Sequence, residues 1–323
     1  MLCWGIAETP GMMSQVRALA LALGATLDVK TLPIGKPWDM LPNIAYATPL
    51  GGRIFKNFIA RDINPPYPDL VISCGRRASM AALGLKHVIQ NDKTKFIHIH
   101  HPCVPVKCFD LVVTVDHDKL DGANVIKTRF ALHSVTPAAL AEARQRSQPR
   151  FAAYPTPHVA VLLGGTTNHY EFTIEAMAQI VMALGRMVNA TPGSLLITPS
   201  RRTGDANIAM LKSVFAANPR VYIYDEVEEN PYMGMLALAS TIVVTNDSIN
   251  MMSEAAATGK PIYILPLPKH SSTKQARFAD GLIRDGIARL WSGKLENWHY
   301  DVSNEMETLA AEVRRRLNLL PSH

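Results

Sequence analysis

A polar patch lies between two apolar runs in the stretch TIVVTNDSINMMSEAAATGKPIYILPL, residues 241–267. The runs are typical of buried strands, and the segment between them predicts a short helix that ends at Gly259. A helix N-terminus can hold a phosphate, and a glutamate one to two turns further on can accept both hydroxyls of a ribose. The patch therefore predicts a nucleotide-diphosphate site, with simple capping of the helix by Asp247 or Ser248 as the alternative. The candidate residues are Asp247, Ser248, Met251, Ser253 and Glu254.

Two further loops in the C-terminal half follow apolar runs and carry small, hydroxyl and basic residues. In LLGGTTNHYEFT the glycine pair allows a ligand close to the backbone, although any tight strand-to-helix turn uses glycines. In LLITPSRRTGDAN the paired arginines suit phosphate, and ion pairs with the protein's own acids are the alternative. The glycines are not followed by the Lys-Ser or Lys-Thr pair of a P-loop. The candidate residues are Gly164, Gly165, Thr166, Ser200, Arg201, Arg202 and Thr203.

The N-terminal half offers three weaker patterns at the ends of predicted strands. The segments ETPGMMSQ and ISCGRRASM could each cap a helix and hold an anion, or serve the fold alone. In TVDHDKLDG, a histidine beside carboxylates could act as a general base near neutral pH, or be an ordinary surface histidine. The candidates are Gly11, Ser14, Gln15, Arg76 and Arg77 for anion binding, and His117 and Asp118 for catalysis.

Other catalytic and metal patterns are excluded by spacing. FIHIHHPCVPVKC has three histidines and two cysteines close together, but their spacing matches no standard zinc template, so we expect no metal. The sequence has no nucleophile elbow, kinase signature or GxGxxG dinucleotide fingerprint. We therefore expect no cofactor beyond a nucleotide substrate.

The composition is that of an ordinary globular protein, with 48% hydrophobic and 19% charged residues among 323. Its net charge of +6 is dispersed, which argues against nucleic-acid binding but suits an anionic substrate or an acidic membrane surface. The four cysteines lack CxxC spacing and predict buried, reduced thiols. No apolar stretch is long enough to span a bilayer, and the N-terminus does not read as a signal peptide. We expect a cytoplasmic protein that is at most peripheral on the inner face of a membrane.

The elements that must position these loops alternate along the whole chain. Short apolar runs separated by helix-length segments predict parallel sheets covered by helices on both faces. A polar, proline-punctuated break at 144–158 indicates a hinge between two domains, 1–150 and 151–323. The fold class is therefore α/β, with two doubly wound Rossmann-type domains facing a cleft. The last helix is a candidate to pack back on the N-terminal domain.

Several motifs together resemble the mitochondrial-fission "elongated mitochondria" family, in its alphaproteobacterial form, over nearly the whole chain. The motifs are GMMSQ, SCGRR, HPCVPVKCFDLVVTVDHD, NVIKTR, LLGG, TPSRRT, NPYMGMLALAS, TNDSINMMSEAAATGKPIYILPLP and KQARFADGLIRDGIARLW. FIHIHHP and TRFALH depart from the usual residues of the family, so the resemblance gives His98, His100 and His101 no role.

That family is in turn similar to the GT-B superfamily of glycosyltransferases, which seat a nucleotide-sugar in the C-terminal domain. The resemblance implies a donor pyrophosphate near 164–166, arginine contacts from Arg201 and Arg202, and ribose or phosphate contacts from Ser248 and Glu254. It places the acceptor against 11–15, Arg76 and Arg77, without a bound metal.

The resulting hypothesis is a GT-B glycosyltransferase that transfers sugar from a nucleotide-sugar, of UDP type, to a cell-envelope or lipid-linked acceptor. Two alternatives stay open. One is a nucleotide-sugar epimerase or hydrolase on the same fold. The other is a non-catalytic, membrane-recruited adaptor related to mitochondrial-fission factors.

Overall fold

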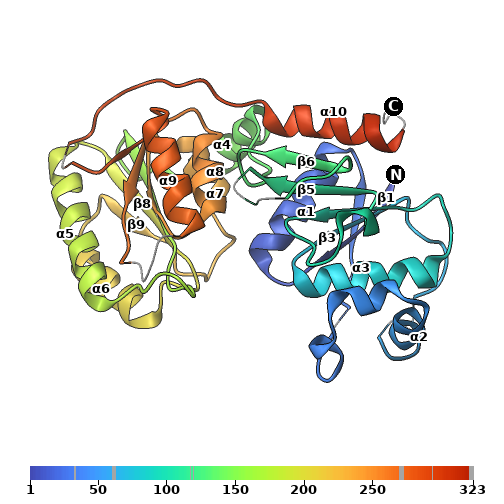
Figure 1. Cartoon of the computed structure of the whole chain (residues 1–323). Coiled ribbons are helices and arrows are strands. Elements are labelled where there is room, and N and C mark those ends of the chain that lie inside the picture. The colour runs from blue at the N-terminus through green and yellow to red at the C-terminus, as the bar shows by residue number, and fades with distance from the viewer. Residues whose placement is uncertain are drawn as a thin grey trace. The chain divides into compact units, whose positions relative to one another are not determined.

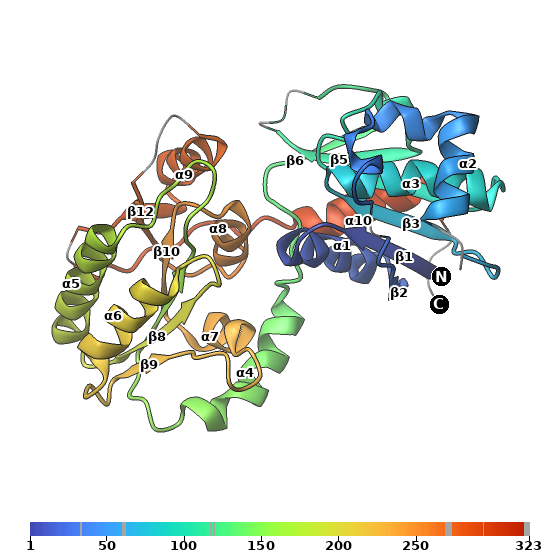
Figure 2. The same cartoon turned by 90° about the horizontal axis from the view of Figure 1, so that it is seen from below.

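The computed structural model describes residues 1–32, 34–59, 63–116, 118, 120–268, 273–292 and 294–319. The chain forms two compact units (Figures 1 and 2). Unit 1 combines Met1–Ser134 with the C-terminal segment Asn304–His323, and unit 2 is Val135–Ser303. Each unit is built around its own parallel sheet.

The sheet of unit 1 has the order β2-β1-β3-β4-β5-β6, with every neighbouring pair parallel. The chain starts at β1, pairs the edge strand β2 on one side and continues with β3 on the other, so the strand order reverses between β1 and β3. Side chains of the central strands are buried on both faces, which is why their sequences are continuous apolar runs. The strands are β1 (Leu2–Ala7), β2 (Thr26–Val29), β3 (Leu70–Cys74), β4 (Lys95–Ile99), β5 (Leu111–Val115) and β6 (Val125–Thr128).

Helices connect these strands and cover both faces of the sheet. Threonine side chains cap two of them, with proline in the first turn where its missing N–H costs nothing. The α-helices are α1 (Pro10–Ala22), α2 (Pro49–Phe58) and α3 (Arg76–Ile89), and the 3-10 turns are η1 (Trp38–Met40), η2 (Asn43–Ala47) and η3 (Val106–Cys108).

The C-terminal helix α10 (Glu305–Leu317) belongs to unit 1 although it is far away in sequence. Leu309, Val313 and Leu317 recur every four residues and are buried in the core that lies against α1. At the start of the helix, the Glu305 carboxylate accepts hydrogen bonds from the backbone N–H groups of Arg129 and Phe130. The last helix therefore completes the covering of the first sheet.

Unit 2 also has a six-stranded sheet that is parallel throughout, but with a different order, β12-β11-β10-β7-β8-β9. The chain enters at the central strand β7, and the order reverses between β7 and β10. Ligands of open α/β sheets bind at the carboxyl ends of the strands beside such a reversal. The strands are β7 (His158–Leu163), β8 (Ser194–Pro199), β9 (Val221–Ile223), β10 (Thr241–Thr245), β11 (Ile262–Leu265) and β12 (Ala288–Leu290).

The helices of unit 2 lie between its strands, as the alternating sequence pattern predicts, with one addition in the predicted hinge. The helices between strands are α5 (Ile174–Ala190), α6 (Asp205–Phe215), α7 (Tyr232–Leu238), α8 (Ile249–Ala256) and α9 (Lys274–Arg284). The addition is α4 (Pro137–Phe151), which occupies much of the predicted hinge.

Helix α4 moves the unit boundary from the expected residue 150 to Ser134–Val135. It packs on α7, where a side chain on Gly234 would overlap Ser147. The Arg144 guanidinium also donates to the Ala237 carbonyl oxygen at 2.6 Å. The polar composition that suggested a linker is that of a helix with only one buried stripe, and the polar face is exposed.

None of the described helices combines the length and the hydropathy needed to cross a bilayer.

We expect Leu309→Ala to destabilise unit 1, because the leucine is 3% exposed in the core under α10. Truncating a buried leucine to alanine costs about 2–5 kcal/mol of unfolding free energy. Truncating an exposed one changes the unfolding free energy by about 0.5 kcal/mol at most. Urea unfolding followed by circular dichroism measures the loss. The matched control is Leu50→Ala, whose side chain is 68% exposed. Equal stability of the two variants would contradict the packing of α10 on unit 1.

Candidate functional site

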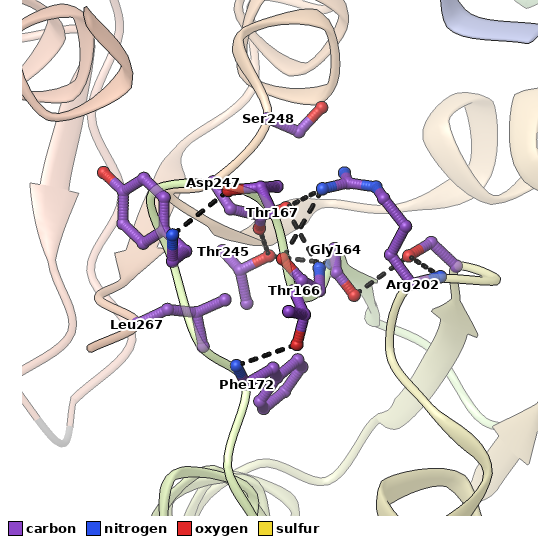
Figure 3. Close-up of polar contacts among 12 residues, drawn as sticks. Gly164, Thr166, Thr167, Phe172, Arg202, Thr245, Asp247, Ser248 and Leu267 are labelled. Atoms are coloured by element: carbon purple, nitrogen blue, oxygen red, sulfur yellow. Dashed lines mark hydrogen bonds and ion pairs between the residues drawn. The ribbon is translucent and has the colours of Figure 1, made fainter. Parts of the chain in front are cut away.

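The candidate site lies where three adjacent central strands of unit 2 end. β10, β7 and β8 are neighbours in the sheet, and their loops begin at Asn246, Gly164 and Ser200 respectively. Figure 3 shows side chains and backbone groups of these loops meeting at one point. Three segments far apart in the sequence thus form one polar cluster.

The Asp247 carboxylate is the centre of this cluster, and its side chain is fully buried. One oxygen, Oδ1, accepts from the Thr245 hydroxyl at 2.7 Å. The other, Oδ2, accepts from the Gly165 N–H at 3.0 Å and pairs with Arg202 Nη1 at 3.0 Å. Thr245 itself accepts from the Gly164 N–H at 2.8 Å. A buried carboxylate is tolerated only with partners of this kind, so Asp247 holds the loops in fixed register.

The loop after β8 is tied to the loop after β7 by hydroxyl groups. Thr203 Oγ1 and Ser200 Oγ donate to the Gly164 carbonyl oxygen at 2.6 and 2.9 Å. In return, the Thr166 N–H donates to the Arg202 carbonyl oxygen at 3.0 Å. Thr166 Oγ1 accepts from the Phe172 N–H, which fixes the chain as it leaves the loop (Figure 3).

The two glycines are required by this packing. A Cβ on Gly164 would overlap the Asp247 carboxylate, and one on Gly165 would overlap the backbone of Arg202 and Thr203. The sequence suggested that the two glycines let a ligand approach the backbone closely. The packing within the protein is enough to account for both glycines. The neighbours that exclude a side chain belong to the protein itself.

Helix α8 begins directly after Asp247. Its N-cap is Ser248, whose hydroxyl accepts from the Met251 N–H at 3.4 Å. Ser248 and Met251 are half-buried, and Ser253 is fully buried. The capping alternative is thus realised by Ser248, which directly follows Asp247 in the chain.

Glu254 lies further along α8, half-buried, and is paired with a tyrosine. The Tyr232 hydroxyl, at the start of α7, donates to Glu254 Oε2 in a short hydrogen bond. Burial raises the pKa of Glu254 to about 7, while the hydrogen bond from Tyr232 opposes that rise. Burial, and then the neighbouring carboxylate, raise the pKa of Tyr232 well above its usual value. Glu254 therefore titrates near neutral pH with the phenol protonated.

The two arginines after β8 differ in their surroundings. Arg202 pairs with Asp247 through one nitrogen, yet 40% of its side chain is exposed. Arg201 is exposed and makes no hydrogen bond or ion pair with any residue in the described part of the chain. A positive charge at a sheet mouth without a protein counter-charge is available to an anionic ligand.

Unit 1 shows the opposite outcome at its own strand reversal. The Arg77 N–H donates to Glu8 Oε1 at 2.6 Å, so a carboxylate of the protein occupies the N-terminus of α3. Arg77 Nη2 pairs with Asp39 Oδ2 at 2.8 Å, and Arg76 donates to the carbonyl oxygens of Asp39 and Leu41. The structural role that the sequence left open therefore describes these arginines, which anchor η1 and the residue after it to α3.

The other unit 1 candidates are spread over helix and loop. Gly11 is exposed, Ser14 half-buried and Gln15 buried along α1, whose N-cap is Thr9. Asp118 is buried and accepts from the Thr114 hydroxyl at 3.2 Å. The predicted base His117 lies outside the described residues.

His98, on β4, is a core residue. It is fully buried, its Nδ1 lies 2.8 Å from Ser73 Oγ, and its ring packs on Phe109. Burial, followed by the neighbouring His100 and His101, lowers the pKa of His98 to about 3, which keeps the ring neutral. In the part of the chain that the structure describes, no group of three or more histidines, cysteines and acids could hold a metal ion.

The family is decided by a match over most of the chain. The family model described as "Mitochondrial fission ELM1" matches residues 10–317. The chain belongs to the mitochondrial fission ELM1 family. Among relatives, the ELM1 protein of Arabidopsis thaliana is 31% identical over 276 residues, which cover 77% of this chain and 64% of the plant protein. An uncharacterized protein of Rickettsia prowazekii is 27% identical over 93% of this chain and 95% of its own length.

Solved structures place this ELM1-family chain in the GT-B-like fold class, with two parallel sheets as expected. A UDP-GlcNAc 2-epimerase of Neisseria meningitidis bound to UDP-GlcNAc matches with a TM-score of 0.57 and 13% identity, covering 99% of this chain and 95% of the other. The epimerase of Methanocaldococcus jannaschii matches with a TM-score of 0.56 and 13% identity, covering 100% and 94%. At such identities the likeness concerns the fold.

Three residues of this ELM1-family chain form key contacts but were not among the sequence candidates: Thr245, Tyr232 and Glu8. Thr245 ends an apolar strand, where a hydroxyl immediately before a polar turn is a usable signal. Tyr232 and Glu8 contact residues 22 and 69 positions away, so their partners could not be read from local sequence.

We expect Gly164→Ala to destabilise unit 2, because the added methyl group would overlap the Asp247 carboxylate. Overpacking of this kind costs about 1–3 kcal/mol. Thermal and urea unfolding measure the loss. The control is Gly185→Ala in α5, where a Cβ meets nothing within 4 Å, and alanine should stabilise the helix by about 0.5–1 kcal/mol. A neutral Gly164→Ala would contradict the close packing of the loop on Asp247.

Proposed function

We propose that this protein binds a nucleoside-diphosphate sugar at the carboxyl ends of β7, β8 and β10 in unit 2. The observation that carries the proposal is the convergence of three polar loops around a helix N-terminus, with Arg201 lacking a partner among the described residues. Phosphate groups bind where helix N–H groups and guanidinium groups point at the same space.

In this proposal the two arginines bind the diphosphate differently. Asp247 fixes the orientation of Arg202, and the exposed remainder of its guanidinium can donate to a phosphate oxygen. Arg201 adds a charge that no described acid neutralises. A pre-oriented guanidinium loses little entropy on binding, which favours the ionic contact.

Glu254 is proposed to bind the ribose. Its Oε2 is taken by Tyr232, and no described residue donates to Oε1. An ionised carboxylate accepts hydroxyl hydrogen bonds strongly. A UDP-type nucleotide is the first choice because matched structures include a Staphylococcus aureus MnaA–UDP complex with a TM-score of 0.50 and 12% identity, and the UDP-GlcNAc complex above.

The proposed reaction is transfer of the sugar to a hydroxyl of a cell-envelope or lipid-linked acceptor, without a metal. The arginines and the N-terminus of α8 would stabilise the negative charge of the departing diphosphate. A base would remove the acceptor proton. Asp118 is buried and hydrogen-bonded, so the base stays unassigned. Arg76 and Arg77 already bind a carboxylate and carbonyl oxygens of the protein itself. They are therefore weaker candidates for binding the sugar acceptor than the sequence suggested.

A second candidate function is epimerisation or hydrolysis of the nucleotide-sugar. It is supported by the matched structures, several of which are named as UDP-GlcNAc 2-epimerases.

We expect wild-type protein to bind UDP-GlcNAc and Arg201→Ala to bind it about 10- to 100-fold more weakly, since a hydrogen bond to a charged group contributes about 1.5–3 kcal/mol. Isothermal titration calorimetry measures both affinities. Arg186→Ala, which removes an exposed arginine on α5, is the matched control for lost charge. No binding to wild-type protein across a panel of nucleotide-sugars would overturn the proposed function.

The reaction is tested by incubating the protein with a nucleotide-sugar labelled in the sugar ring, with and without membrane lipid extract. We expect the label to enter the lipid fraction with release of nucleoside diphosphate. A labelled sugar that is still attached to the nucleotide but has changed configuration at one ring carbon indicates an epimerase. Release of free sugar in the absence of an acceptor indicates a hydrolase. Binding without any turnover would support the adaptor alternative that the family name suggests.

A further inference from the structure

The hydrogen bond between Tyr232 and Glu254 joins α7 to the helix that begins at the candidate site. Glu254 is the one charged residue of α8, and α7 carries no charged residue. The phenol of Tyr232 takes one carboxylate oxygen from the protein side and leaves Oε1 without a described donor. The carboxyl group is therefore held by a single side chain.

We propose that Tyr232 is a positioning residue whose hydrogen bond orients the Glu254 carboxylate toward a ribose diol, so that nucleotide-sugar affinity depends on the protonation state of Glu254. The inference rests on the proposed function, because it needs Glu254 to bind the ribose. It goes beyond that function by assigning a role to a residue on another helix and by predicting regulation by pH.

The position of α7 supports this role. Its C-terminal carbonyl groups are bound by cations: Lys260 Nζ donates to Leu236 and Ala237, and Arg144 donates to Ala237. Cations at a helix C-terminus stabilise it by neutralising the negative dipole end. These contacts fix α7 in place. Tyr232 is at the other end of the same helix, so its phenol has a defined position.

Among the described residues, the Tyr232 phenol is the side chain that hydrogen-bonds to Glu254. The elements packed on α8 differ in the charged groups that they carry. β10 packs on α8 and carries no charged side chain, while α9 also packs on α8 and carries Lys274, Arg277, Asp280 and Arg284. The shift in the pKa of Glu254 comes from two effects: burial raises the pKa to about 7, and the hydrogen bond from Tyr232 opposes this rise. Removing the phenol should therefore raise this pKa further.

The sign of the pH effect follows from the form that binds. The ionised carboxylate accepts ribose hydroxyl groups, so affinity is full above the pKa of Glu254 and falls as the pH drops below it. Between about pH 8 and about pH 6, the ionised fraction falls about tenfold for a group with this pKa, and affinity should fall in proportion. UDP-GlcNAc is a suitable probe because its pyrophosphate is esterified at both ends and does not titrate in this range.

The first experiment measures UDP-GlcNAc affinity by calorimetry across this pH range for wild-type protein, Tyr232→Phe and Glu254→Gln. We expect the midpoint of the wild-type profile near pH 7, a higher midpoint for Tyr232→Phe, and weak, pH-independent binding for Glu254→Gln. Tyr300→Phe is the matched control: the Tyr300 hydroxyl donates to the Ala256 and Lys260 carbonyl oxygens, so its loss affects the C-terminal end of α8. A merely structural role for Tyr232 would lower stability as Tyr300→Phe does and leave the pH profile unchanged, which would overturn the inference.

The second experiment needs no ligand. Infrared difference spectroscopy follows the carbonyl band of the protonated Glu254 carboxyl, assigned by its absence in Glu254→Gln. We expect Tyr232→Phe to move the titration midpoint upward and Tyr300→Phe to leave it in place. An unmoved midpoint in Tyr232→Phe overturns the inference by itself. A moved midpoint without UDP-GlcNAc binding by wild-type protein refutes the proposed function and the ribose role, while the hydrogen bond's effect on the carboxyl stands.

Discussion

The buried carboxylate of Asp247 is the constraint on which the polar end of the second sheet depends. A charge without access to water is costly unless hydrogen bonds and a counter-charge replace its hydration. Here a backbone N–H, a hydroxyl and a guanidinium do so. Each partner comes from the end of one of three adjacent strands or the loop that follows it. Satisfying one carboxylate therefore fixes the register of all three loops, and with them the start of α8.

The two units are both doubly wound parallel sheets, but their strand orders and their electrostatic outcomes differ. Both have an arginine pair directly after a strand, in SCGRR at the end of β3, which borders the reversal of strand order, and in TPSRRT at the end of β8, which is the neighbour of β7. In unit 1 the protein's own acids, Glu8 and Asp39, occupy the positions that an anionic ligand would take. In unit 2 one arginine is committed to Asp247, and Arg201 remains exposed. This difference is why we propose the ligand site in unit 2.

Helices α4 and α7 connect the fold to the chemistry of the site. α4 packs on α7 and supplies Arg144, which together with Lys260 binds the end of α7. The other end of α7 presents Tyr232 to Glu254. Burial, and then the neighbouring Arg144, lower the pKa of Lys260 to about 8. The predicted hinge is thus a structural support for residues at the candidate site.

The sequence by itself determined the local elements. Buried parallel strands are continuous apolar runs, and polar loops follow them, so the fold class and the loops could be predicted, as could the capping alternative for Ser248. Only the tertiary structure decided which polar residues meet. A helix with one narrow buried stripe has the composition of a linker, which is why α4 was missed. The partners of Gly165, Glu8 and Tyr232 lie 82, 69 and 22 positions away. Because the two arginine pairs have the same local propensity, only their distant contacts distinguish them: residues 39–41 bind both Arg76 and Arg77, whereas Arg201 has no partner in the described part of the chain.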